Sequence, residues 1–131
     1  MNYRYRCACG NVYDSPDQYS VCPTCQRQNS TENCGIVQIY RMGNYAGMAV
    51  GMGLYVDQQP YGHVANKGSV KLVVPYGQHQ LHATLSTCRK SNNPIITLTP
   101  QAPECYFKIS MPFFGGILNF NLATKDSMPE K

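Results

Sequence analysis

Apolar and polar residues alternate along several short segments in the last hundred or so residues of the chain. The clearest alternation runs from Met48 to Val56, where every second residue has a large apolar side chain. A period of two places such side chains on one face of a β-strand. The further segments that we predict to be strands are 36–41, 69–74, 78–87, 95–99, 104–111 and 117–122.

Clusters of Gly, Pro, Asn and Asp separate these segments and predict the turns between them. These clusters lie at 57–60, 66–68, 75–77, 92–94 and 100–103. The dense scatter of Gly and Pro disfavours helices, and no helical period is found in the sequence. Seven short strands at spacings of roughly ten residues are typical of a β-sandwich, in which two antiparallel sheets pack face to face. We therefore predict an all-β fold.

The N-terminal part of the chain has a different composition. It contains four of the seven cysteines but hardly any aliphatic side chains except Val12 and Val21. A cross-link must therefore stabilise this part in place of an apolar core. The segment 26–34 is polar, lacks a hydrophobic period and is predicted to be a linker. We therefore expect a small ribbon with its linker in residues 1–33 and a β-sandwich domain in residues 34–131.

The four N-terminal cysteines form two closely spaced pairs. Cys7 and Cys9 are separated by one residue, and Cys22 and Cys25 are separated by two. Zinc in structural sites prefers four thiolate or imidazole ligands in a tetrahedron, and two cysteine pairs on two turns supply that set. Gly10 suits the turn after the first pair, because glycine tolerates a positive φ. This pattern predicts one zinc ion held by the four thiolates.

The residues around these cysteines resemble two known families. The runs YRCACGNVYD (5–14) and CPTC (22–25) are similar to bacterial zinc ribbons and to a shortened rubredoxin. The resemblance implies a structural zinc ion or, in the rubredoxin case, an iron ion that carries one electron. The chain departs from both families at Gln26, where glycine is usual, and in the close spacing of the first pair. The close spacing favours zinc over iron, because the rubredoxin iron site relies on two equivalent turns. Cys34 is kept as an alternate ligand.

A second resemblance covers residues 36–111. The runs YVD (55–57), NKGS (66–69) and VVPYGQHQL (73–81) are similar to PEGA-like and related transthyretin-like domains of bacteria. This resemblance implies a seven-stranded sandwich of the immunoglobulin or transthyretin type and a non-catalytic module. The chain departs from the family pattern at Gln58, where the tight turn usually has glycine.

The sequence offers little that points to catalysis. It has no Gly-x-Ser-x-Gly elbow and no Gly-rich loop that ends in Gly-Lys-Ser/Thr. Strand alternation places His79 and His82 on opposite faces, so these two histidines do not share a metal ion. Cys88 and Cys105 are expected to be small buried hydrophobic residues. We therefore expect a protein that is not an enzyme.

The net charge of +4 is spread along the chain and forms no dense basic stripe. The N-terminus has positive charges but no apolar stretch behind them, so no secretory signal is expected. No run approaches the ~20 apolar residues of a membrane-spanning helix. These features favour a cytoplasmic protein without a transmembrane segment.

The preferred function is protein–protein interaction or scaffolding, with the ribbon as a rigid knob and an unknown protein as the partner. One alternative is a nucleic-acid-binding ribbon, in which Arg4, Arg6 and Arg27 make the contacts together with nearby tyrosines. Another alternative is a rubredoxin-like iron electron carrier. The sequence alone leaves these alternatives open.

Overall fold

The computed structural model describes residues 2–42, 51–85, 91–110 and 118–128. These residues form strands and one short 3₁₀ helix, η1 (Lys125–Ser127), so the predicted all-β class is confirmed. The largest sheet consists, in spatial order, of β12 (Asn119–Leu122), β11 (Glu104–Ser110), β5 (Cys34–Arg41), β8 (Ser69–Pro75), β1 (Tyr3–Arg6) and β2 (Val12–Ser15).

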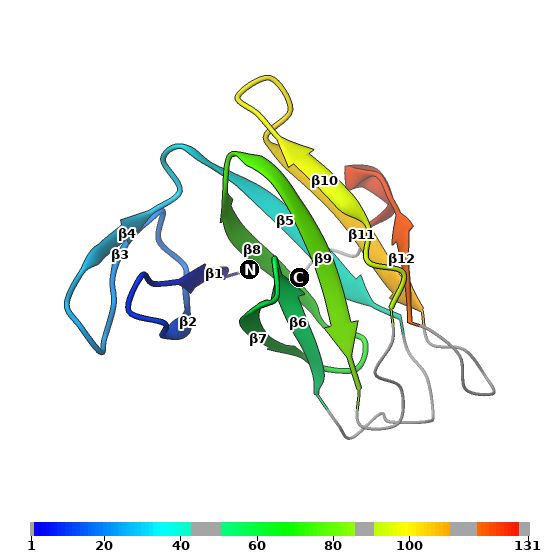
Figure 1. Cartoon of the computed structure of the whole chain (residues 1–131), viewed down its shortest axis with the longest axis horizontal. Helices are drawn as coiled ribbons and strands as arrows, with labels where there is room; N and C mark the ends of the chain where they lie inside the picture. The colour runs from blue at the N-terminus through cyan, green and yellow to red at the C-terminus, as the bar shows by residue number, and fades with distance from the viewer. Residues whose placement is uncertain (1, 43–50, 86–90, 111–117, 129–131) are drawn as a thin grey trace.

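Two further sheets complete the described part of the chain. The four-stranded sheet consists, in spatial order, of β10 (Ile95–Leu98), β9 (Gly77–Thr84), β6 (Met52–Val56) and β7 (Gln59–Val64). The two-stranded sheet pairs β3 (Tyr19–Val21) with β4 (Gln28–Ser30). This small sheet lies at one end of the molecule, beyond β2 (Figure 1).

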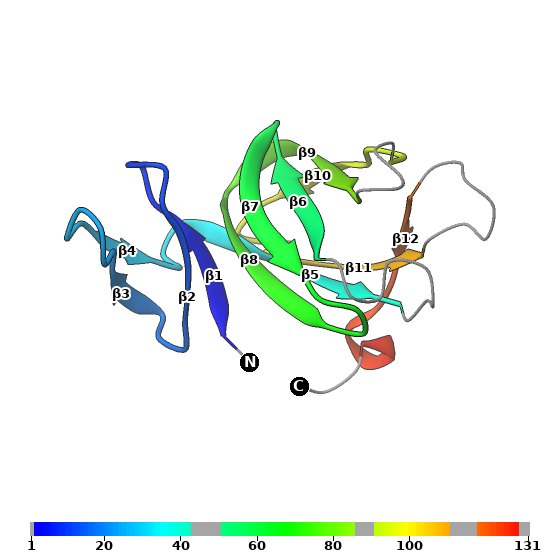
Figure 2. The ribbon, with the colours of Figure 1, turned by 90° about the horizontal axis from the view of Figure 1, so that it is seen from below.

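The apolar core lies between the six-stranded and the four-stranded sheet, which form two layers (Figure 2). Along most of the strands from β5 to β12, alternate residues point into this space, as the period of two predicts. Core residues from the larger sheet include Val37, Ile39, Val70, Leu72, Val74, Phe107 and Ile109, and those from the smaller sheet include Met52, Leu54, Val56, Leu81, Ala83, Ile96 and Leu98. Burial of one such Leu or Ile side chain stabilises the fold by roughly 1.5–3 kcal/mol.

Strand β6 confirms the strongest alternation in the sequence over the part that the structure describes. Met52, Leu54 and Val56 are buried on one face of this strand. The preceding part of the predicted strand, 48–50, lies outside the described residues.

Two strand pairs are parallel, whereas only antiparallel pairs were expected. Strand β5 runs parallel to β11, and β1 runs parallel to β8. Parallel neighbours need a long connection between them, and each of these pairs is far apart in the chain. The hydrophobic period of one strand does not reveal the direction of its partner.

Strand β7 was not predicted, because Pro60 was assigned to a turn at 57–60. The turn is shorter: Asp57 and Gln58 both have a positive φ, of 51° and 68°, as a two-residue hairpin of type I′ requires. Strand β7 then begins at once and includes Pro60. Proline is tolerated there because β7 is an edge strand, where a missing N–H disrupts no ladder.

The N-terminal hairpin β1–β2 is continuous with the large sheet. Tyr3 and Arg4 of β1 pair with Lys71 and Leu72 of β8. Strand β4 lies within the segment predicted to be a linker, so that segment is not structureless. The division into two domains stays a prediction, and the structure adds that strands from both parts share one sheet.

Candidate metal centre

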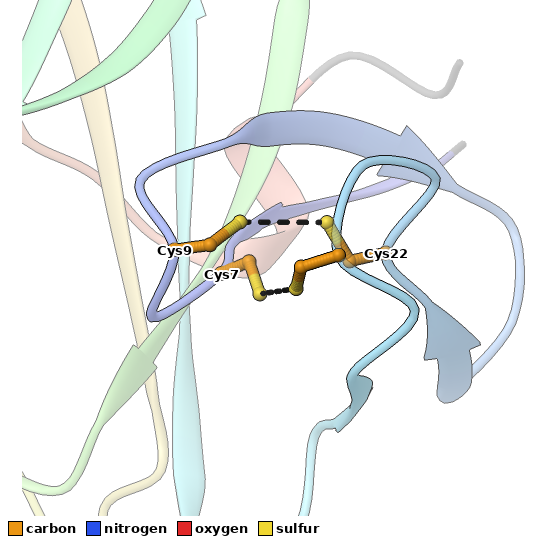
Figure 3. A group of neighbouring side chains, drawn as sticks. Cys7, Cys9 and Cys22 are labelled. Carbon is orange, nitrogen blue, oxygen red and sulfur yellow. Dashed lines mark hydrogen bonds between the residues drawn. The ribbon is translucent and has the colours of Figure 1, made fainter.

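The first cysteine pair lies in the turn between β1 and β2. The N–H of Cys7 donates to the carbonyl of Asn11 at 2.8 Å, and the N–H of Gly10 donates to the carbonyl of Cys7 at 2.8 Å. Gly10 has a φ of +98°, which confirms why glycine is placed here. These bonds fold the chain back so that Cys7 and Cys9 face the same side of the turn (Figure 3).

The second pair lies in the turn between β3 and β4. The N–H of Cys22 donates to the carbonyl of Arg27 at 2.8 Å, and the N–H of Gln26 donates to the carbonyl of Cys22 at 3.0 Å. Gln26 has a φ of +67°, although it has a side chain. A non-glycine residue with a positive φ costs roughly 1–2 kcal/mol, so the conformation of Gln26 lowers the stability of this turn.

The two turns face each other and bring the four sulfur atoms together. The Sγ atoms of Cys7 and Cys25 are 3.5 Å apart, and those of Cys9 and Cys22 are 3.7 Å apart (Figure 3). All four lie within 4.8 Å of one another. Zinc–sulfur bonds of about 2.3 Å in a tetrahedron require sulfur–sulfur separations of about 3.8 Å. The four predicted ligands are thus arranged as a metal ion needs them.

Hydrogen bonds at the site stabilise the thiolate form of the buried cysteines. The N–H of Cys9 is the main group that lowers the pKa of Cys7. Burial acts to raise the pKa of Cys22, but the N–H groups of Cys25 and Thr24 and the side chain of Asn11 outweigh it and lower this pKa to about 6. The thiolate is the form that binds metal ions.

Cys25 shows the opposite behaviour. The N–H of Arg27 acts to lower the pKa of Cys25, but the hydrogen bond with Cys7, together with burial, raises it to about 12. When neighbouring cysteines share protons, a thiolate on one of them disfavours a second thiolate beside it, because like charges repel. A cation between the four sulfurs would replace these protons and neutralise the charge.

Asn11 is a residue of the site that the sequence did not single out. Its Nδ2 atom donates to the Sγ atom of Cys22 at 3.5 Å. Such outer hydrogen bonds orient metal ligands and tune their charge. The available signal was a side-chain amide directly after the Cys-Gly turn, one residue before β2.

The tyrosines of this region pack beside the site and connect the two hairpins. Tyr5 is only 2% exposed, its ring stacks on Tyr13 at 5.5 Å between centroids, and its hydroxyl donates to the carbonyl of Asp17 at 2.5 Å. Asn29 of β4 donates to the hydroxyl of Tyr13 at 2.9 Å. Burial raises the pKa of Tyr5 to about 12, so this hydroxyl keeps its proton. Tyr5 is therefore not available for stacking on a ligand.

Two of the three arginines proposed as nucleic-acid contacts are bound within the chain. Arg4 donates through Nε to Asp14 Oδ1 at 2.8 Å and through Nη1 to the carbonyl of His63 at 2.5 Å. Arg6 donates to the carbonyl of Pro60 at 3.0 Å. Arg27 is exposed. The guanidinium groups of Arg4 and Arg6 thus hold β1 against β7.

The remaining cysteines do not join the cluster in the described part of the chain. Cys34, the predicted alternate ligand, begins β5 and is not among the four residues whose sulfurs converge. Burial raises the pKa of the Cys34 thiol, and it is also the main cause of the raised pKa of the Cys105 thiol. Cys105 is partly buried against the core, in keeping with its predicted apolar role. Cys88 lies outside the described residues.

None of the three histidines, all of which the structure describes, is among the residues whose ligand atoms converge at the metal centre. His79 contacts Asp57 Oδ2 through Nδ1 at 2.5 Å and the carbonyl of Pro75 through Nε2 at 2.7 Å. His82 contacts Asn93 Oδ1 through Nδ1 at 2.7 Å. These contacts connect the β6–β7 turn, the end of β8 and the segment before β10 to strand β9.

Comparisons with protein-family models, with curated proteins and with solved structures find no match for this chain. The resemblance to PEGA-like domains therefore gains no support from known families. The resemblance to a zinc ribbon is supported by the four converging cysteines. Within the described ranges, no helix has the length and apolar character needed to cross a membrane.

Proposed function

We propose that this chain is a non-enzymatic zinc-binding protein whose ribbon acts as a protein–protein interaction module. The observation that carries this proposal is the convergence of Cys7, Cys9, Cys22 and Cys25 within 4.8 Å. Four thiolates fill a tetrahedral shell and leave no position for a substrate or an activated water molecule. Such a closed site stabilises a fold and does not itself catalyse a reaction.

Zinc is the proposed ion because the two turns of the site are not equivalent. One residue separates Cys7 from Cys9, whereas two separate Cys22 from Cys25. The iron site of a rubredoxin uses two equivalent turns, so the resemblance to that family is weakest at the first turn. Zinc has no geometric preference from its d electrons and tolerates such an asymmetric set.

The proposed contact surface is the exposed side of β3. Tyr19 and Val21 are 55% and 53% exposed, and they are two residues apart on the same strand, so they lie side by side on one face. Strand β3 ends directly before Cys22, so an ion at this cysteine would hold the pair in place. Exposed aromatic residues are enriched where proteins bind one another.

A pair of matched variants tests this surface. Affinity capture from cells that naturally make the protein would compare the wild-type chain with the double variant Tyr19→Ser, Val21→Ser and with the control Thr24→Ala, which changes another exposed residue of the same hairpin. We expect one protein partner to be retained by the wild-type and control chains and lost by the double variant, with the zinc content unchanged in all three. Equal capture by all three chains would contradict the proposed surface.

A further inference from the structure

The strands of the four-stranded sheet contain no Lys, Arg, Asp or Glu. In the six-stranded sheet, by contrast, β1, β2, β5, β8 and β11 all have such residues. The outer face of the four-stranded sheet, which is turned away from the core, is therefore made by uncharged side chains (Figure 2). A face without cations does not suit the phosphates of a nucleic acid or an anionic membrane. It suits a neutral ligand.

A hollow of about 230 Å³ lies on this outer face, lined by Asp57, Gln78, His79, Gln80 and Ile95. Gln78 and Gln80 are two residues apart on β9, and Ile95 of β10 pairs with Gln80. Their three side chains therefore point to the same side of the sheet. All three residues are exposed, and Ile95 is 62% exposed. The hollow thus combines two amide groups with one apolar side chain.

The polar groups of the hollow are able to bind hydroxyl groups. Each glutamine amide has both a donor and an acceptor, and neither Gln78 nor Gln80 uses its amide in a hydrogen bond within the described part of the chain. Asp57 is fixed in place, because Oδ1 accepts from the N–H of Gln80 at 2.9 Å and Oδ2 contacts His79 at 2.5 Å. Its side chain is 49% exposed, and a carboxylate has about four acceptor positions, so it still has acceptor positions for a ligand.

The ring of Tyr55 lies next to the hollow on the same face. Tyr55 of β6 pairs with His82 of β9, which is two residues from Gln80. A methyl group on Gly53 would lie 3.5 Å from the ring of Tyr55 and 3.7 Å from its hydroxyl, so this side chain lies along β6 and does not stand out from the sheet. The rings of Tyr55 and His82 are in contact, at 5.6 Å between centroids. Tyr55 is partly exposed, so its ring offers an aromatic surface held in one orientation.

The ligand that matches this combination has apolar C–H groups and many uncharged hydroxyls, as a sugar ring has. We propose that the outer face of the four-stranded sheet binds a neutral carbohydrate chain. Tyr55 and Ile95 contact the C–H faces of its sugar rings. The hydroxyl groups exchange hydrogen bonds with the amides of Gln78 and Gln80 and donate to Asp57.

The spacing of the contact residues favours an oligosaccharide over other ligands. Tyr55 and Ile95 lie two strands and two residues apart, which is roughly 12 Å, so they contact different units of a chain. A single-stranded nucleic acid could also stack on Tyr55, but its phosphates need cations that these four strands lack. A protein interface usually gathers its apolar residues at its centre, whereas amide groups separate the two apolar residues here.

Titration of the full zinc-loaded chain with maltohexaose, cellohexaose and chitohexaose tests the proposal, with heparin and single-stranded DNA as anionic probes. We expect at least one neutral oligosaccharide to bind with a Kd of about 0.1–1 mM, because few groups make contact. Chemical shifts in NMR spectra should change at the side-chain amides of Gln78 and Gln80 and around Tyr55. Saturation of the tyrosine rings should be transferred to the C–H protons of the bound sugar.

Matched variants test the role of each group. Tyr55→Ala should weaken binding by roughly tenfold or more, because one ring stacking contact is lost, whereas Tyr55→Phe keeps the ring and should bind like the wild-type chain. Tyr106→Ala removes a tyrosine from β11 of the other sheet and should leave binding unchanged. Circular dichroism and zinc content would show that the variants fold. If Tyr55→Ala does not fold, the double variant Gln78→Ala, Gln80→Ala replaces it, because both side chains are exposed.

Three results would overturn the proposal. The first is no binding of any of the three neutral oligosaccharides at about ten times the expected Kd, and the second is tighter binding of heparin or DNA than of the neutral sugars. The third is unchanged affinity in the folded Tyr55→Ala chain, since the sugar would then bind elsewhere. None of these results depends on Tyr19, Val21 or the four cysteines, so this proposal and the proposed function fail separately.

Discussion

Arg4 of β1 passes directly over the backbone of Gly62 in β7. A methyl group on residue 62 would lie 3.0 Å from the Nη1 atom of Arg4, and Gly62 has a φ of +78°. The contact lets the guanidinium group reach the carbonyls on either side, at Tyr61 and His63. This one residue pair therefore joins the metal-binding hairpin to the four-stranded sheet.

The variant Gly62→Ala should destabilise the protein by about 2 kcal/mol or more, because it adds both an unfavourable φ and a close contact with Arg4. The matched control is the same substitution in an Arg4→Ala background, which keeps the φ of +78° and removes the contact. Urea unfolding of the zinc-loaded chains measures the loss in each background. Equal losses in the two backgrounds would show that the contact with Arg4 contributes nothing.

The variant Arg4→Ala should cost about 1–3 kcal/mol, because it leaves the carboxylate of Asp14 and two carbonyls of β7 without their donor. Arg27→Ala removes the same charge from an exposed position and should change the free energy of unfolding by less than about 0.5 kcal/mol. Chemical denaturation followed by circular dichroism distinguishes the two. If both substitutions lowered the free energy of unfolding by the same small amount, Arg4 would be an ordinary surface residue.

The variant Gln26→Gly should stabilise the ribbon by about 0.5–1 kcal/mol, because glycine adopts the observed φ of +67° without steric cost. Gln28→Gly, made two residues later in β4, should instead destabilise it, since glycine in a strand gains nothing and loses chain entropy. Thermal unfolding with zinc bound gives both values. A loss of stability in Gln26→Gly would mean that its side chain, and not its backbone, is needed.

The carboxyl group of Asp57 makes the free energy of unfolding depend on pH in the acidic range. Burial acts to raise the pKa of this carboxyl, but the hydrogen bonds from His79 and from the N–H of Gln80 lower it below its usual value. A lowered pKa in the folded state contributes stability above the unfolded value of about 3.9, and this contribution is lost as the pH falls through the folded value. Asp57→Asn should therefore be less stable than the wild-type chain near neutral pH, and the gap should close toward pH ~3.

The gap is expected to be below about 1 kcal/mol, because the Asp57 side chain is half exposed and screened by solvent. Acid also protonates the cysteine thiolates, but it does so in both proteins, so the quantity to measure is the difference between their two stability curves. Asp126→Asn, at an exposed position, serves as the control. A gap that widened on acidification would contradict the assigned role of Asp57.

The sequence predicted what depends on local chemistry. Spacing alone identified the four converging cysteines, and the period of two identified the buried face of β6 at Met52, Leu54 and Val56. The hairpin β3–β4 escaped prediction because its strands carry no apolar period. It pairs within a polar segment, next to the turn that holds Cys22.

The sequence could not predict contacts between distant segments. Arg4 and Arg6 read as surface charges, yet they satisfy carbonyls more than fifty residues away on β7. Strand β7 itself was missed because Pro60 was assigned to a turn, although proline is tolerated here since the strand is at an edge of its sheet. Edge position is a property of the assembled sheet, and a single strand does not encode it.

The central claim, one zinc ion in the shell of four cysteines, is tested most directly by elemental analysis of the untagged chain. The comparison includes Cys9→Ser and Cys22→Ser, with Cys34→Ser as the matched control outside the cluster. We predict one zinc ion per chain in the wild-type and control proteins, and a loss of zinc in the two ligand variants. Iron in place of zinc would favour the electron carrier, and a wild-type chain that binds no metal would contradict the account.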